Sequence, residues 1–232
     1  MRVLYAALAA AALLDLVPAA AAEPPRRVAL GYEVSHNGTV VVEATETLEH
    51  DGRRYRIRSE WKGKGLYARA RRGSALRSSE GAVEGGHLRP AEFRDQRGEA
   101  PLGIARFDWA HRQLVLEREG RIETRPLPER AQDRLSFAWG FAFAPPAQEE
   151  IEVFVADAKG LSRQRYRVAG AELLRTAAGD FDAVKLVKQR EAGDPRTTEI
   201  WLAAKADYLP LRILVVEKDG TRIDQVVTWI GR

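Results

Sequence analysis

Hydrophobic and polar residues alternate with a period of two over most of this chain, beginning near Arg26. One side of the first segment carries Val28, Leu30, Tyr32 and Val34. A period of two places successive side chains on opposite faces of a β-strand. Asn37-Gly38 follows at once and is the strongest short signal for a hairpin, with Val40 and Val42 beginning the return strand. The chain therefore opens with an antiparallel hairpin.

The same alternation returns after each of a series of glycine-containing turns. After Asp51-Gly52, one face carries Tyr55, Ile57, Ser59 and Trp61. Further strands are predicted near 73–82, 87–96, 100–109, 112–118, 121–125, 150–157, 162–169, 171–177, 183–190, 197–203, 209–217 and 221–230. Short strands separated by regular turns are typical of barrels and sandwiches. We expect a mainly β protein, an antiparallel β-barrel or half-barrel of ten or more strands.

One segment breaks this pattern and has the period of a helix. Over 129–142 one face carries Ala131, Leu135, Ala138, Trp139 and Ala142. Pro128 can begin this helix, and Pro145-Pro146 ends it. Phe137, Phe141 and Phe143 add apolar side chains around the rest of the circumference, so the helix must be buried on several sides. It is expected to pack on or across the open side of the barrel.

The first 22 residues have the composition of a signal peptide. Arg2 precedes an apolar run from Val3 to Leu14, and Ala20-Ala21-Ala22 suits signal peptidase. The run is too short to span a bilayer permanently, since a spanning helix needs about 20 apolar residues. We expect cleavage near Ala22, a periplasmic location, no integral membrane segment, and a single β-rich domain over 23–232.

Composition narrows the classes of partner. The chain has no cysteine, so it forms no disulfide and offers no site for a lipid anchor. It has 30 Arg and 7 Lys, but the formal net charge is only +4. This modest charge and an exported location argue against nucleic acid as a partner.

No familiar catalytic pattern is present in the sequence. His36, His50, His87 and His111 are scattered near predicted turns, where surface positions are expected, and no pair has metal-ligand spacing. No serine lies in a Gly-x-Ser-x-Gly elbow. We therefore predict no catalytic residues, no cofactor, no metal site and no enzymatic activity. A cell-envelope hydrolase would need Asp108, Asp133 and a distant histidine to meet in a cleft.

Several motifs resemble an uncharacterised family of bacterial exported proteins, domain of unknown function 3108. They are Phe107-Asp108-Trp109, Pro126-Leu127-Pro128, 131–136, 179–183, 199–203, 208–212, Asp219-Gly220 and Asp224-Gln225. The last strands, with Trp201-Leu202 and Leu209-Pro210-Leu211-Arg212, also look like the closing strands of lipoprotein-carrier half-barrels. The family has no established activity. The half-barrel likeness implies a curved sheet that holds acyl chains against a helix.

These features together favour a non-enzymatic envelope protein that binds an apolar or amphipathic ligand, such as lipid or lipoprotein, between curved sheet and helix. The predicted apolar lining is Trp109, Leu135, Phe137, Trp139, Phe141 and Trp201. A basic rim for a head group is predicted at Arg69, Arg71 and Arg72. A scaffold or adaptor that docks another envelope protein by an edge strand is the alternative.

Overall fold

The computed structural model describes residues 24–69, 74–190 and 196–232. Its first half contains β1 (Arg27–His36), β2 (Thr39–His50), β3 (Arg54–Gly63), α1 (Leu66–Arg69), β4 (Ala75–Glu84), β5 (His87–Arg97), β6 (Gly103–Asp108), β7 (Gln113–Arg118) and β8 (Arg121–Pro126). Its second half contains β9 (Gln132–Asp133), α2 (Arg134–Gly140), β10 (Glu150–Asp157), β11 (Gly160–Thr176), β12 (Gly179–Lys188), β13 (Thr197–Ala203), β14 (Pro210–Val216) and β15 (Arg222–Gly231). The expected mainly β fold is confirmed.

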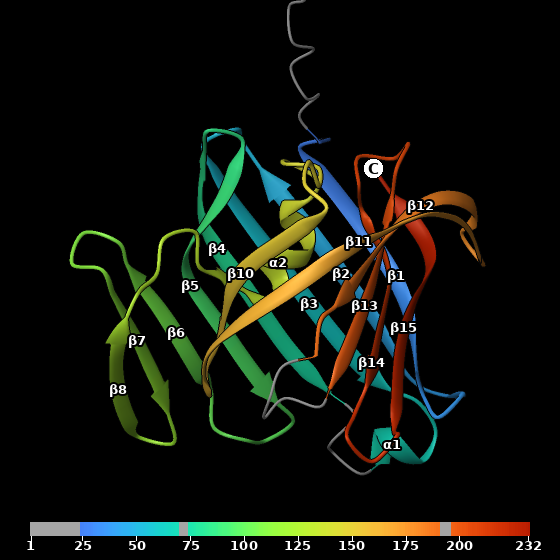
Figure 1. Cartoon of the computed structure of the whole chain (residues 1–232). Helices are drawn as coiled ribbons and strands as arrows, with labels where there is room; N and C mark the ends of the chain where they lie inside the picture. Colours follow the sequence, from blue (N-terminus) through green and yellow to red (C-terminus); the bar gives the residue numbers. More distant parts are fainter. Residues whose placement is uncertain (1–23, 70–73, 191–195) are drawn as a thin grey trace, which may run out of the picture.

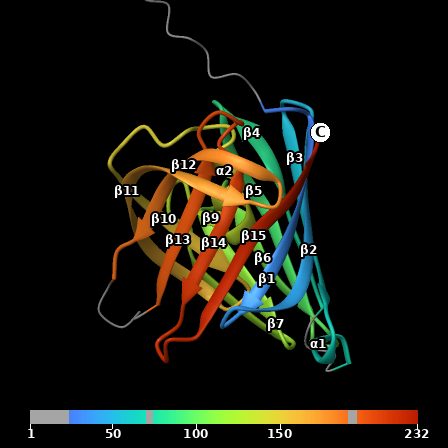
Figure 2. The same ribbon diagram turned by 90° about the vertical axis from the view of Figure 1, so that its right-hand side faces the viewer.

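All strands belong to one sheet, in the order β8-β7-β6-β5-β4-β3-β2-β1-β15-β14-β13-β12-β11-β10-β9. Neighbours along this order are antiparallel, except that β9 runs parallel to β10. The first and last strands of the chain pair at the centre of the sheet, with Ala29 opposite Gly231. Figure 1 and Figure 2 show the two halves of the meander diverging from this central pair.

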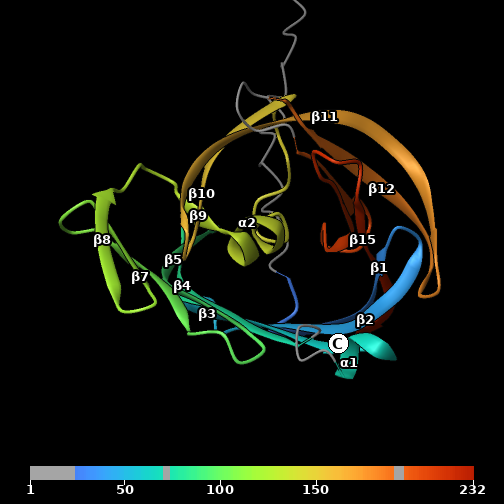
Figure 3. The ribbon, with the colours of Figure 1, turned by 90° about the horizontal axis from the view of Figure 1, so that it is seen from below.

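The sheet curls into a barrel-like shape whose two edges do not join by a ladder of hydrogen bonds. Seen along its axis in Figure 3, β9 and β10 reach the inner side of β5, while β7 and β8 continue outward as a flap. Contact across this seam is made by side chains: Gln132 Nε2 donates to the Leu88 carbonyl at 2.9 Å. Gly103 on β6 lies against Ala158, in the turn between β10 and β11. The barrel is therefore closed by packing.

The helix α2 lies inside this curve, next to β4, β5, β9 and β10 (Figure 3). Leu135, Phe137 and Trp139 are all buried, as is Phe141 directly after the helix. Burial on several sides agrees with the prediction from its apolar circumference. None of the helices in the described part of the chain has the length and apolar character needed to cross a membrane.

The helix is shorter than the predicted 129–142. Arg130 has a φ of 57°, outside the helical range, and Gln132-Asp133 pairs with β10 instead. Ala131 and Ala142 are buried as a helical face would require, but they belong to the flanking turns. The periodic apolar residues therefore continue beyond the helical backbone.

Two other expectations about the elements are corrected. The predicted strands 162–169 and 171–177 form one long strand, β11, whose register with β12 shifts between Val168 and Ala171. Gly170 has a φ of 104° there, which lets the strand turn without ending.

The short helix α1 was not predicted. The expected signal peptide, residues 1–22, lies outside the described residues, and the single domain over 23–232 stays a prediction.

The seam between β6 and the β10–β11 turn allows a direct test. A Cβ atom added at Gly103 would lie 2.4 Å from the Ala158 Cβ. Gly103→Ala should therefore reduce the free energy of unfolding by about 1–3 kcal/mol, because neither atom can move without shifting backbone. Urea denaturation measures this change.

Gly160→Ala is the matched control, because nothing lies within 4 Å of a Cβ at Gly160. Its stability should equal or slightly exceed that of the parent. Adding Ala158→Gly to Gly103→Ala should restore part of the loss. Equal stabilities of Gly103→Ala and Gly160→Ala would show that the seam is not tightly packed.

Candidate functional site

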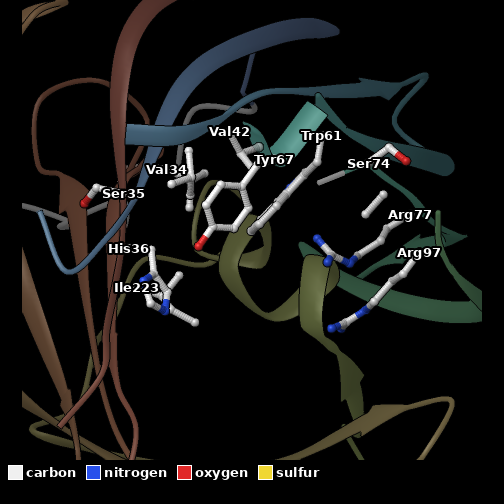
Figure 4. A pocket seen from close by; sticks show the side chains of 12 residues that line it. Val34, Ser35, His36, Val42, Trp61, Tyr67, Ser74, Arg77, Arg97 and Ile223 are labelled. Carbon is white, nitrogen blue, oxygen red and sulfur yellow. The ribbon is translucent and has the colours of Figure 1, made fainter. Parts of the chain in front are cut away.

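A cavity of about 180 Å³ lies at the α1 end of the barrel. Its walls come from β1, β2, β3, α1, the start of β4, the end of β5 and β15 (Figure 4). The lining residues are Val34, Ser35, His36, Val41, Val42, Trp61, Tyr67, Ser74, Ala75, Arg77, Arg97 and Ile223. His36, Tyr67, Ser74 and Arg97 are exposed, so the cavity is accessible from solvent.

One side of the cavity is apolar. Val34 and Val42 are opposite each other on β1 and β2, and both are buried. Ile223 on β15 and the rings of Trp61 and Tyr67 complete this side, as Figure 4 shows. Trp61 is directed inward by the same alternation that buries Tyr55 and Ile57 on β3.

The other side carries two guanidinium groups that share one carboxylate. Arg77 Nε lies 3.0 Å from an Asp95 oxygen, and Arg97 lies 3.0 Å from the other oxygen. The side chains of Arg77 and Asp95 are only 12% and 11% exposed, whereas Arg97 is 46% exposed. Burial opposes the ionisation of Asp95, but the two arginines hold its pKa below the ordinary value. Arg97 is thus the accessible cation of this group.

A chain of hydrogen bonds leads from the cavity to α2. The Arg77 guanidinium stacks on the Trp61 ring at 4.5 Å, and Trp61 Nε1 donates to Ser59 Oγ at 3.1 Å. Ser59 donates to one oxygen of Glu46 at 3.0 Å, and Trp139 Nε1 donates to the other at 2.9 Å. Burial raises the pKa of Glu46, while these donors act in the opposite direction. Both oxygens of Glu46 are therefore paired inside the barrel.

A second buried carboxylate fixes the start of α2. Asp133 Oδ1 accepts the backbone N–H groups of Leu135 and Ser136 at 2.8 and 2.9 Å, and Ser136 Oγ accepts the Asp133 N–H at 2.9 Å. This reciprocal pair is a capping box. Asp133 Oδ2 accepts the Ser79 hydroxyl from β4 at 2.6 Å, and Tyr55 is hydrogen-bonded to Ser79 at 2.9 Å. Asp133 thus joins the helix to the wall of the barrel.

The predicted lining residues do not all meet at one place. Phe137 and Phe141 pack with Val153, Val155, Tyr166, Leu186, Ile200 and Leu202. Trp139 belongs to the main core with Leu135 and Trp201. Trp201 lies between Ile200 and Leu202 in β13, so its side chain points to the opposite face of the strand. It packs against Lys185 and Arg212, at 4.7 and 4.5 Å.

Trp109 packs against the same main core. Trp109 is half-buried beside β5, where its Nε1 donates to the Pro90 carbonyl at 2.7 Å. Arg69 ends α1, at the same end of the barrel as the cavity. Arg71 and Arg72 lie outside the described residues. The six predicted aromatic and aliphatic lining residues are not among the described residues that line the cavity.

Asp108 and Asp133 do not meet in one cleft. Asp108, the last residue of β6, binds His111 at 2.8 Å at an exposed position, while Asp133 is buried beside α2. His50 corrects the expectation of a surface histidine: it is buried, and its Nε2 lies 2.9 Å from the Pro24 carbonyl. Among the residues that the structure describes, no group of three or more histidine, aspartate or glutamate side chains could hold a metal ion.

Sequence reasoning missed the residues that form the cavity. Ser59 gave one usable signal, because a serine on the inward face of an otherwise apolar strand predicts a buried polar partner. Tyr67 gave none, since α1 has only four residues and no periodicity to detect.

The pKa of Asp133 gives a testable pH dependence. Burial raises this pKa from 3.8 to about 6, against the effect of its hydrogen bonds. A carboxyl group whose pKa is higher in the folded state stabilises the fold fully below pH 4 and loses this contribution as pH rises through 6. The unfolding free energy of the parent, relative to Asp133→Asn, should fall by up to about 3 kcal/mol between pH 4 and pH 7.

Urea denaturation at both pH values measures that difference. Asp180→Asn is the control, because Asp180 is exposed. The difference in unfolding free energy between the parent and Asp180→Asn should not change in this way between pH 4 and pH 7. A difference between the parent and Asp133→Asn that stays constant with pH would contradict the assignment.

Several solved structures of other proteins superpose on this chain. A β-barrel-like protein of domain of unknown function DUF1849 from Brucella abortus superposes with a TM-score of 0.54 at 8% identity, covering 90% of this chain and 99% of that one. This likeness shows the fold. A candidate exported protein with a YmcC-like fold from Bacteroides fragilis gives a TM-score of 0.33 at 8% identity, covering 88% and 95%. A candidate lipoprotein from Parabacteroides distasonis gives 0.32 at 9% identity, covering 88% and 94%.

No curated protein matches the chain in sequence. The model of a protein family of unknown function, DUF3108, matches residues 31–227, which include every strand from β2 to β14 and most of β1 and β15. The chain belongs to the DUF3108 family.

Proposed function

We propose that this protein is a non-enzymatic envelope protein that binds the negatively charged end of an amphipathic ligand, such as a lipid, together with the adjoining hydrocarbon segment, in the cavity at the α1 end of the barrel. The observation that carries the proposal is the pairing of an apolar wall with an accessible arginine. Val34, Val42, Ile223 and two aromatic rings face the space beside Arg97. Such a combination matches a hydrocarbon segment followed by a negative group.

The size of the cavity limits how much of a ligand it can enclose. Dry cavities of roughly 150 Å³ admit a molecule as large as benzene, whereas sites for whole ligands usually measure about 300–1,000 Å³. A cavity of about 180 Å³ therefore suits one end of an acyl chain. The rest of the ligand would lie outside, across the apolar surface of Val40, Leu66 and Tyr67, of which Leu66 is 79% exposed.

The aromatic residues of α2 have a supporting role in this proposal. Trp139 reaches the cavity wall through Glu46, Ser59 and Trp61. Phe137 and Phe141 pack against β10, β12 and β13, where they hold the helix in the barrel. The proposed location is the periplasm, after removal of residues 1–22 as a signal peptide.

A hydrolase finds no support in this geometry, because Asp108 lies at an exposed position and Asp133 in the core. The scaffold alternative keeps one favourable observation, the exposed edge strand β8.

The direct experiment is mass spectrometry of organic extracts from the mature protein, purified from a bacterial periplasm without detergent. A stoichiometric lipid is the expected result. The binding of a fluorescent fatty acid then locates the site. Ile223→Trp, which fills the cavity, should weaken binding at least about tenfold, the equivalent of about 1.4 kcal/mol.

Leu173→Trp is the matched control, because Leu173 is an exposed leucine of β11 away from the cavity. Its affinity should equal that of the parent. Phe141→Leu distinguishes the cavity from the aromatic residues around α2 as the binding site. Binding should persist if the ligand lies in the cavity, and it should weaken if the ligand lies against α2. Loss of binding in Phe141→Leu alone would overturn the cavity assignment.

The charge of the ligand has its own test. Arg97→Gln should weaken the binding of the fatty acid by about two- to fivefold, as expected for a partly exposed ion pair. It should not change the binding of the corresponding fatty alcohol. An equal loss for both probes would indicate that Arg97 acts on the shape of the cavity and not on charge.

A further inference from the structure

The strand β8 forms the outer edge of the sheet and stands clear of the barrel. Figure 1 and Figure 3 show β7 and β8 as a flap on the far side from α2. Every residue of β8 is exposed except Arg125, which is partly exposed. Ile122 is 71% exposed, a high value for a large apolar side chain. A second chain can therefore approach this edge without meeting the body of the barrel.

The hairpin that contains β8 determines which backbone groups are free. β7 and β8 are joined by Glu119-Gly120, both with positive φ, and Arg118 pairs with Arg121 across this turn. In a two-residue hairpin the pair beside the turn is hydrogen-bonded, and such pairs alternate along an antiparallel ladder. Arg121, Glu123 and Arg125 therefore bond to β7. The N–H and C=O groups of Ile122 and Thr124 point outward, to the open edge.

The side chains of β8 alternate in charge. Arg121, Glu123 and Arg125 occupy one face, and Glu123 binds Arg125 at 2.7 Å. Within the described residues Arg121 has no ion pair. The edge thus presents an unpaired cation two residues from an anion.

We propose that β8 pairs with β8 of a second copy of this chain, antiparallel and about a twofold axis at Ile122. In a twofold pairing of this kind a residue on the axis lies opposite its own copy. With Ile122 on the axis, Arg121 lies opposite Glu123 of the other copy, and Glu123 opposite its Arg121. The outward N–H and C=O groups of Ile122 bond to those of Ile122 in the other copy, and Thr124 lies opposite Gly120 in the turn of that copy.

Neighbouring registers are less favourable. An axis at Glu123 would place Glu123 opposite Glu123 and Arg121 opposite Arg125, so like charges would meet directly. An axis at Thr124 would place Ile122 opposite Pro126, which has no N–H to donate. Of these three registers, only the axis at Ile122 places an anion opposite Arg121, so charge selects Ile122 as the centre.

The interface is small. β8 has six residues, and the flap offers no second layer to pack against. Stable interfaces bury about 1,200–2,000 Å² in total, more than one short strand supplies. The pairing is therefore expected to be transient in solution, and covalent capture is the appropriate measurement.

Because the chain has no cysteine, any disulfide formed by a single-cysteine variant must join the introduced residues of two copies. Ile122→Cys, Glu123→Cys and Thr124→Cys are each oxidised in the purified protein, and disulfide-linked dimer is measured on a non-reducing gel. Directly opposed residues of a hydrogen-bonded pair have Cα atoms about 5.5 Å apart, within the range of a disulfide. Ile122→Cys should form dimer at least about fivefold faster than Glu123→Cys or Thr124→Cys, whose copies lie farther apart.

Leu173→Cys controls for random collision, because Leu173 is also an exposed leucine but lies on β11. Equal rates for Ile122→Cys and Leu173→Cys would overturn the pairing. Fastest dimer formation by Glu123→Cys or Thr124→Cys would overturn the register.

Charge reversal gives an independent measurement. In the Ile122→Cys background, Glu123→Arg should slow dimer formation several-fold, because two arginines then meet across the interface. Adding Arg121→Glu should restore the rate, since the opposed pair is again Glu with Arg. A doubly reversed protein as slow as the single variant would contradict the proposed contact.

Discussion

The buried carboxylate of Asp133 is the contact on which the closed shape of the molecule depends. It accepts two N–H groups at the start of α2 and the hydroxyl of Ser79 on β4, so one side chain fixes the helix and attaches it to the wall. Asp133 also belongs to β9, the last strand of the sheet. Its position therefore holds the sheet edge, the helix and the opposite wall together.

This arrangement explains how an open sheet can enclose a core. A barrel usually closes by pairing its first and last strands, which removes the free edges. Here β9 reaches β5 without a ladder, and Gln132, Gly103 and Ala158 make the contact. The sheet can consequently continue past the seam as β6, β7 and β8. Closure by side chains leaves the hairpin flap outside, with one edge unpaired.

The strands were accessible to prediction from sequence because alternation and turn residues are local signals. The helix was predicted too long, since Ala131 and Ala142 are buried at helical spacing although Arg130 has a left-handed backbone. The cavity could not be predicted. Its walls join Val34, Trp61, Arg97 and Ile223, which are distant in sequence and meet only through the curl of the sheet. The inward-facing Glu46 and Ser59 were signs of a polar interior.

The pairing of β1 with β15 has a consequence for the order in which the molecule can form. The central strand β1 pairs with β2, which directly follows it in the sequence. Its other neighbour is β15, which lies almost 200 residues later in the sequence. Contacts so distant in sequence require a large loop to close and slow the folding of β proteins. The growing chain must therefore remain without the β1–β15 ladder until β15 has been synthesised. Such a delay would keep the chain unfolded during most of its synthesis.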